Sequence, residues 1–242
     1  MSRPIAKPKK KPPIDAWRKS LPDRNARFEL YLKSCCEGLG LLKAESVDII
    51  ITDPPYAEEY LPVYEDLGRL AAHALKPGGL ALVMTGQSYL LQVGATLSAH
   101  LDYHWTLTYL TPGGQAVQQF PRTVNIFWKP VLLYRKGEWR PNWFGDVVKS
   151  AVNDNDKQHH EWGQSVSGMQ DLMRRFVRPG ATVLDPFLGG GTTALVALEL
   201  GAYFIGFDTD AQAITTTKAR IVSDAHATAR LLEAINHAPL PA

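Results

Sequence analysis

The sequence predicts an α/β fold built on a mostly parallel sheet. Short β-rich runs such as VDIIIT (47–52) and ATVLD (181–185) alternate with longer segments whose apolar residues recur at helical spacing. These runs are apolar nearly throughout, which is typical of strands buried on both faces of a sheet. With 45% apolar residues in 242, the chain can bury a sizeable core.

Each expected strand is a short apolar or alternating run, and each expected helix has apolar residues at helical spacing. We expect strands at 27–33, 47–52, 80–86, 102–110, 130–137, 181–185 and 202–208. We expect helices within 35–46, 61–75, 167–177, 192–200 and about 211–234. KPGG (76–79) should end the second helix, because proline and two glycines cannot continue it.

The composition excludes several classes of protein. No apolar run is long enough to cross a bilayer, and the N-terminus lacks the apolar stretch of a secretory signal. The only cysteines, Cys35 and Cys36, are adjacent, so they form neither a disulfide framework nor a zinc site. No other metal site is predicted, and a reducing, cytoplasmic setting follows.

Residues 1–26 are predicted to be a disordered basic tail, followed by a single domain over 27–242. The stretch MSRPIAKPKKKPP holds five cations and no acid, and its prolines and charges cannot build a core. A solvated leader and an arm that contacts phosphates both remain open for this tail.

A glycine-rich turn lies within ATVLDPFLGGGTTALVALELGAYFIGFD (181–208). Gly189, Gly191 and Ala194 fit the pattern G-x-G-x-x-[GA], and Asp208 ends the next strand. Such a turn lets a ligand approach the backbone beside a helix N-terminus, and the acid can hold ribose hydroxyls. Only some thirty residues follow Asp208, so the other strands come from earlier in the chain. This order counts against an ordinary nicotinamide dehydrogenase.

The stretch Asp53-Pro54-Pro55-Tyr56 ends another buried run. Its prolines fix their φ angles and leave carbonyls exposed to accept hydrogen bonds. A carboxylate beside a rigid carbonyl offers two acceptors to an amino group, and Tyr56 offers a flat face for a base. If the strands at 47–52 and 181–185 are neighbours, this turn faces the glycine loop, since ligands bind beyond the carboxyl ends of the strands.

TDPPY and DPFLGGGTT together resemble the signature motifs of amino-methylating DNA methyltransferases that use S-adenosylmethionine. The catalytic motif precedes the cofactor motif, as in the permuted β group of that family. LKPGGLALV, NIFWKPVLLYRKG and HEWGQS resemble later family elements, so the resemblance covers nearly the whole chain from residue 27. It implies a circularly permuted Rossmann-like methyltransferase fold with a seven-stranded, mostly parallel sheet and an antiparallel edge strand.

The resemblance also implies roles for individual residues. Asp53 and the Pro54 carbonyl would accept the hydrogens of the target amine, within the catalytic set Asp53, Pro54, Pro55 and Tyr56. Tyr56 would stack on a base flipped out of double-stranded DNA. The implied cofactor-binding residues are Ser34, Cys35, His160, Gln164, Asp185, Phe187, Gly189, Gly191, Thr192, Thr193 and Asp208.

Two departures lie on the cofactor side. The family usually has Gly-Asp-Cys before its first helix, where this chain has Lys33, Ser34 and Cys35. The family's Lys-Pro pair after the histidine is here Gln164 and Ser165. Affinity for the cofactor is therefore the property these departures put in question.

Target recognition is expected in two insertions, 111–128 and 136–158, which mix cations with aromatic residues. The predicted DNA contacts are Arg122, Trp128, Lys129, Lys136 and Arg140. An edge hairpin or a dimer interface is an equal alternative for these segments. The DNA would be that of the nucleoid, and a homodimer and a cognate restriction endonuclease are compatible partners.

The function that follows is site-specific methylation of DNA at N6 of adenine, since Asp at the head of the motif favours adenine in this family. Three rivals stay open. They are an N4-cytosine DNA methyltransferase, an RNA or protein methyltransferase with a similar PPY motif, and a binding protein that keeps the fold with little turnover. The second rival normally has the glycine loop first.

Overall fold

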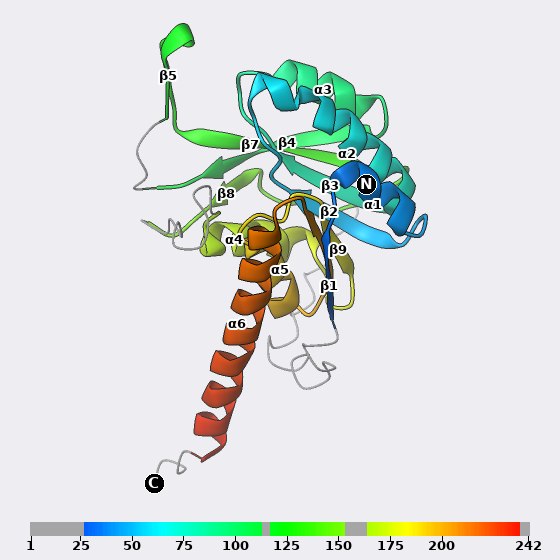
Figure 1. Cartoon of the computed structure of the whole chain (residues 1–242). Coiled ribbons are helices and arrows are strands. Elements are labelled where there is room, and N and C mark those ends of the chain that lie inside the picture. The colour runs from blue at the N-terminus through cyan, green and yellow to red at the C-terminus, as the bar shows by residue number, and fades with distance from the viewer. Residues whose placement is uncertain (1–26, 113–116, 153–163, 238–242) are drawn as a thin grey trace, which may run out of the picture.

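The computed structural model describes residues 27–112, 117–152 and 164–237, whose centre is an eight-stranded sheet (Figure 1). The strand order is β1 (Phe28–Leu32), β10 (Tyr203–Asp208), β9 (Thr182–Asp185), β2 (Val47–Thr52), β3 (Leu75–Met84), β7 (Trp128–Arg135), β4 (Asp102–Leu110) and β8 (Val147–Lys149). Each strand is parallel to its neighbours except β7, which is antiparallel to β3 and β4. The predicted α/β fold with a mostly parallel sheet is confirmed.

Two details of the sheet differ from the expectation. It has eight strands in the described part of the chain, and the antiparallel strand β7 lies inside the sheet rather than at its edge. Residues 131–134 of β7 are all buried, which requires a partner strand on each side and a layer on each face. Beyond β7, the sheet is completed by β4, which was expected, and by the short β8, which no sequence pattern indicates.

Helices cover both faces of the sheet (Figure 1). One layer holds α1 (Cys35–Leu41), α2 (Leu61–Ala74) and α3 (Leu90–Ser98), and the other holds α4 (Val166–Phe176), α5 (Thr192–Glu199) and α6 (Ala211–His237). Ile50 packs in the core with α2, whereas Ile49 and Ile51 pack in the core with α4 and α5. Burial on both faces explains why VDIIIT is apolar without alternation. No helix in the described ranges is long and apolar enough to cross a membrane.

The region around KPGG both meets and departs from the expectation. α2 ends at Ala74, as predicted, but β3 begins at once and runs through Lys76-Pro77-Gly78-Gly79. The pairing of β3 with β2 shifts register there, and Gly78, at φ 80°, donates its N–H to the carbonyl of Lys136 at 2.7 Å. A bulge tolerates a proline without N–H, so the strand continues through it.

A small hairpin projects from the sheet between β4 and β7 (Figure 1). It consists of β5 (Val117–Gln119), the 3-10 turn η4 (Phe120–Arg122) and β6 (Val124–Ile126), inside the predicted insertion at 111–128. The second insertion, 136–158, contributes β8, and its residues 153–158 lie outside the described ranges, as do the predicted tail 1–26 and His160. Another 3-10 turn, η3 (Glu58–Tyr60), precedes α2.

At the centre of the sheet, β9 from the C-terminal part of the chain lies next to β2 from the N-terminal part. β9 pairs with β2 in parallel, with Ile49 opposite Val183 and Ile50 opposite Leu184. The strands expected at 47–52 and 181–185 are therefore neighbours. Their carboxyl ends open on the same edge of the sheet, which is where ligands bind in open α/β folds.

Candidate active site

A buried contact ties the turn after β2 to the loop after β9. Thr52 donates its hydroxyl to Asp185 Oδ1 at 2.7 Å, and the Phe187 backbone N–H donates to the same oxygen at 3.1 Å. Asp185 is 2% exposed, and this burial raises the pKa of its carboxyl to about 7 despite those hydrogen bonds. Asp185 therefore links the turn that follows β2 to the loop that follows β9 through its buried carboxyl group.

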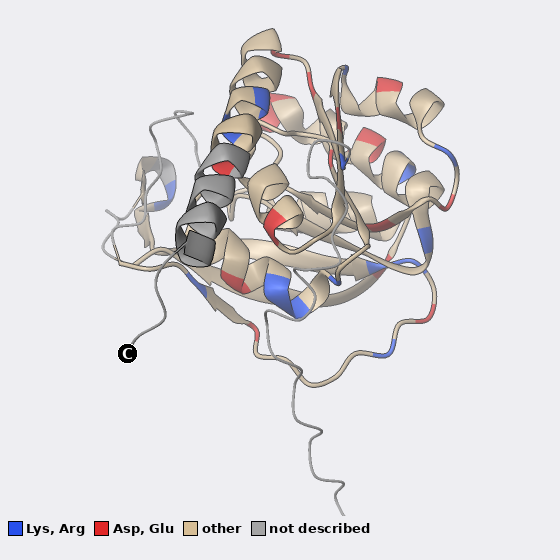
Figure 2. Cartoon of the chain, turned by 90° about the horizontal axis from the view of Figure 1, so that it is seen from below, with Lys and Arg blue, Asp and Glu red and all other residues tan. Residues whose placement is uncertain are grey.

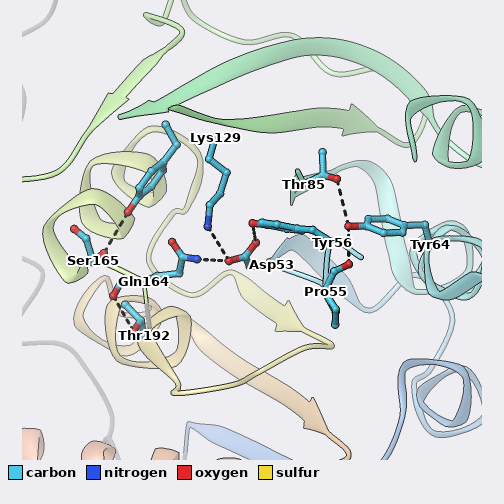
Figure 3. A network of polar contacts seen from close by, with 10 residues as sticks. Asp53, Pro55, Tyr56, Tyr64, Thr85, Lys129, Gln164, Ser165 and Thr192 are labelled. Carbon is cyan, nitrogen blue, oxygen red and sulfur yellow. Dashed lines mark hydrogen bonds and ion pairs between the residues drawn. The ribbon is translucent and has the colours of Figure 1, made fainter. Parts of the chain in front are cut away.

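Asp53 stands at the head of the turn and receives three donors from distant elements. Lys129 Nζ lies 3.2 Å from Asp53 Oδ2, and the Gln164 side-chain amide donates to the same oxygen. The Tyr56 hydroxyl donates to Asp53 Oδ1. Figure 3 shows the three groups converging on this carboxylate, whose side chain is 21% exposed. The Asp53 carboxylate therefore connects the turn after β2 with β7 and with the segment before α4.

Tyr56 is held in place by packing as well as by its hydroxyl. A Cβ atom added to Gly86 would lie 3.1 Å from Tyr56 Cβ, so the ring rests against the backbone that follows β3. Burial, together with the neighbouring Asp53, raises the pKa of Tyr56 well above its usual value. Its phenol therefore stays neutral, with a flat face and a hydroxyl donor.

The rest of the turn is braced from α2. Tyr64, a buried residue of that helix, donates its hydroxyl to the Pro55 carbonyl at 3.3 Å and contacts Thr85 Oγ1 at 3.3 Å (Figure 3). Proline φ angles are already fixed, so this added bond leaves the turn little freedom. No sequence pattern singled out Tyr64, Thr85 or Gly86, although Thr85 and Gly86 end an expected strand at the same sheet edge.

The glycine loop is shaped by close contact with α6. Gly191, at φ 78°, lies so close to Thr217 that an added Cβ would be 2.4 Å from Thr217 Oγ1. The Gly189 carbonyl accepts from Thr217 at 3.4 Å, and the Gly190 carbonyl accepts from Arg220. Gly191 caps α5, whose first residues, Thr192 and Thr193, are buried. Only glycine suits this position.

Asp208 lies beside the glycine loop, as its spacing predicts. Its Oδ2 accepts from the Gly189 N–H at 2.8 Å, and its Oδ1 accepts from the Asp210 N–H at 2.9 Å. The side chain is half-buried at the end of β10. A carboxylate has about four acceptor positions, so these two bonds leave capacity for hydroxyl groups of a ligand.

The start of α1 approaches the same place. The Lys33 N–H donates to the Asp208 carbonyl at 2.9 Å, which places Ser34 near the acid. Ser34 and Glu37 form a capping box, in which the Ser34 N–H donates to Glu37 at 2.9 Å. Donors from Lys33 and Ser34 lower the pKa of Glu37 to about 2. Cys35 is 5% exposed, and burial raises the pKa of its thiol.

The five cationic and aromatic residues predicted to contact DNA do not form one surface. Arg122 lies on the hairpin and donates to the Ser88 carbonyl at 3.1 Å, and Trp128 is the first residue of β7. Lys129 points to Asp53. Lys136, at the opposite end of β7, donates to the Leu75 carbonyl at 2.8 Å, and Arg140 pairs with Glu138 at 2.6 Å. Of these five residues, those on or just after the hairpin are therefore nearer the catalytic turn than Lys136 and Arg140.

Comparison with known proteins agrees with this geometry. Residues 143–219 match the family model of the N6/N4 DNA methylases, described as DNA methylase. This segment includes α4, the glycine loop and β10. Over these residues the chain is similar to the N6/N4 DNA methylases.

Similar proteins were found both by sequence and by fold, and this chain is compared with three of them. It is 23% identical over 236 aligned positions to the type II methyltransferase M2.DpnII of Streptococcus pneumoniae, covering 77% of this chain and 86% of the relative. The M1.HpyAVI–SAM complex superposes with a TM-score of 0.68 at 20% identity, covering 80% of this chain and 98% of that one. The cytosine-N4-specific PvuII DNA methyltransferase gives 0.69 at 16% identity, covering 83% and 92%.

Proposed function

We propose that this chain moves a methyl group from S-adenosylmethionine to the exocyclic amine of a base flipped out of duplex DNA, with N6 of adenine as the target. The observation that carries the proposal is the buried Thr52–Asp185 contact, 2.7 Å long. It joins an acceptor turn suited to an amine to a glycine loop suited to a nucleoside. Two substrates that must react with each other would thus meet at one edge of the sheet.

The residues around the glycine loop fit the cofactor. Asp208 retains acceptor capacity for ribose hydroxyls, and the close backbone at Gly189 and Gly191 allows a ligand to approach. Phe187 adds a partly exposed aromatic ring at the loop. Ser34, where the family usually has Asp, keeps its hydroxyl in the capping box with Glu37. We therefore assign the contact with the cofactor's ribose to Asp208. The contact with its adenine we assign to residues near the start of α1 other than Ser34.

The acceptor turn would prepare the amine for attack. The lone pair of an aromatic amine is delocalised into the ring, so it is a poor nucleophile. Asp53 and the Pro54 carbonyl would accept the two amine hydrogens and favour a pyramidal nitrogen whose lone pair points out of the ring plane. S-adenosylmethionine supplies an electrophilic methyl group on a positively charged sulfur. Asp53 would then stabilise the positive charge that develops on nitrogen and is placed to take the proton that the amine loses.

The DNA side of the proposal rests on the hairpin and the strand that follows it. Residues 117–129 contain the cations Arg122 and Lys129 and no acid, and the projecting hairpin correspondingly shows no acidic residue (Figure 2). Phe120 and Phe127 are 78% and 70% exposed there. Cations with exposed aromatic rings suit phosphates and unstacked bases. The hairpin leads directly into Lys129 at the catalytic turn, which supports a role for it in contacting the duplex beside a flipped base.

Adenine and cytosine remain the two candidate bases. Asp53 at the head of the motif favours adenine in this family, whereas a solved relative of similar fold is named cytosine-N4-specific. We take adenine as the target and cytosine N4 as the alternative. The setting would be the bacterial cytoplasm, on chromosomal DNA.

One experiment tests the proposal. The protein and its Asp53→Ala variant would be expressed separately in a host free of DNA methylation, and modified bases would be mapped across the genome. We expect one short motif methylated at adenine with the wild-type protein and none with the variant. Methylation at cytosine would select the alternative. An unmodified genome, together with measured binding of the protein to DNA, would favour the rival in which the fold binds without turnover.

A further inference from the structure

We infer that Lys129 reads the target base together with Asp53, by donating a hydrogen bond to the ring nitrogen next to the exocyclic amine. This inference rests on the proposed function and names a residue that sets its base specificity. It assigns Lys129 a place inside the catalytic site, whereas its cationic character alone suggests a phosphate contact.

The backbone of Lys129 is fixed on both sides. It is the second residue of β7 and pairs with Tyr109 of β4. The carbonyl before it accepts from the Gln87 side chain at 3.1 Å, and the Pro130 carbonyl after it accepts from the Thr85 N–H at 3.1 Å. A side chain that starts from so constrained a position reaches a defined point.

That point is the catalytic turn. The Lys129 ammonium lies 3.2 Å from Asp53 Oδ2 and 5.2 Å from the centre of the Tyr56 ring (Figure 3). Its side chain is 29% exposed, so the charge is directed inward. An ammonium has three N–H donors, and Asp53 accepts one of them. The ion pair therefore presents an acceptor and a donor side by side, beside an aromatic ring suited to stacking.

A base edge complementary to this pair has an amine next to an unprotonated ring nitrogen. Adenine has it at N6 and N1, and cytosine has it at N4 and N3. Thymine has a ring N–H and no amine on that edge. Guanine's amine N2 lies between N1–H and N3, so on its Watson–Crick edge it is next to a ring N–H. Oδ2 already accepts from Lys129 and Gln164, whereas Oδ1, among the described residues, accepts only from Tyr56 and keeps a position for the amine. Because Nζ lies beside the same carboxylate, the ring atom next to that amine would face Lys129. An acceptor there satisfies the ammonium, whereas N–H or C–H leaves a charged donor unpaired.

The structural alternative is that Lys129 only neutralises and orients Asp53. In that case its removal would slow methylation of every substrate by the same factor. If Lys129 reads the base, the effect of removing its side chain must depend on whether the substrate has the ring nitrogen. The two possibilities separate when the substrate atom and the protein side chain are changed together.

The test uses duplexes carrying the methylated motif, with adenine or 1-deazaadenine at the target position, which replaces only the ring nitrogen by C–H. If the genome map shows cytosine, cytosine and 3-deazacytosine take their place. Methyl-transfer kcat/KM is measured for the wild type, Lys129→Met, Lys129→Gln and the control Lys43→Met, which makes the same change on an exposed lysine before β2. The ratio of the two substrates cancels the intrinsic difference in their reactivity.

We expect the wild type to prefer adenine over its deaza analogue by about 10- to 100-fold more than Lys129→Met does, the range for one hydrogen bond to a charged group. Lys129→Gln keeps an N–H donor and should retain part of the preference, and Lys43→Met should match the wild type. Equal ratios in the wild type and Lys129→Met would overturn the inference.

Two further outcomes are possible. Should Lys129→Met fail to fold, the ratios of the wild type and Lys129→Gln are compared instead, and equal ratios in these two contradict the inference. Should the wild type methylate neither duplex, the proposed function fails, and the same ratio is then read from equilibrium binding of the two duplexes. Failure of the function and failure of the inference are thereby distinguished.

Discussion

Replacing Asp185 with Asn should change how the stability of the fold depends on pH. Burial is the largest influence on this carboxyl and raises its pKa from 3.8 to about 7. The folded state thus binds a proton between pH 4 and 7 that the unfolded state releases. The resulting stabilisation is fully present below about pH 4 and is lost as pH rises through 7. The difference between the two pKa values corresponds to about 4 kcal/mol.

Asparagine has nearly the same shape as aspartate, keeps an oxygen for the Thr52 hydroxyl and the Phe187 N–H, and never ionises. The free energy of unfolding of Asp185→Asn, relative to wild type, should therefore rise by up to about 4 kcal/mol between pH 4 and 8. Urea unfolding followed by the fluorescence of the six tryptophans measures it. Asp102→Asn, which changes a carboxylate with 58% side-chain exposure, is the matched control. Parallel pH curves for Asp185→Asn and wild type would refute the reasoning.

Three further changes test the site. Asp53→Ala should abolish methyl transfer while the protein folds and binds S-adenosylhomocysteine as before, and near wild-type turnover would contradict its assignment. Asp208→Ala should weaken S-adenosylhomocysteine binding by about 1–3 kcal/mol in calorimetry; unchanged affinity would limit its role to the Gly189 and Asp210 contacts. Deleting residues 1–13, which carry five cations, should flatten the slope of log affinity for DNA against log salt by about 0.9 for each phosphate that the tail neutralises. The methylated motif should stay the same in that variant, and parallel salt plots would show that the tail does not bind phosphates.

The central strands and the pairing of functional motifs were predictable because their signals are local. Buried runs such as 47–52 mark parallel strands, and the distance from Gly189 to Asp208 is set by one helix and one strand. The helix α3 was not expected, since LLQVGATLS has no charged residues to mark a polar face. The strands β5, β6 and β8 have three residues each, too few for a periodic pattern.

The destinations of the cations were not predictable for a different reason. Lys129 and Lys136 look alike in sequence and lie seven residues apart near the two ends of β7. At about 3.3 Å per residue they are separated by roughly 23 Å. Only the antiparallel direction of β7 decides that Lys129 meets Asp53 and that Lys136 reaches the other edge of the sheet. That direction is a tertiary property.

The order of the two motifs along the chain has little effect on the site itself. The turn at Asp53 and the loop at Gly189 are more than a hundred residues apart, yet they meet because β2 and β9 are neighbours. The buried hydrogen bond between Thr52 and Asp185 fixes the distance between the turn and the loop. A permutation moves the ends of the chain to another loop and leaves that strand pair unchanged. The chemistry therefore depends on which strands are adjacent, and a change that removes the Thr52–Asp185 bond should affect it more than one, such as Asp185→Asn, that keeps the bond.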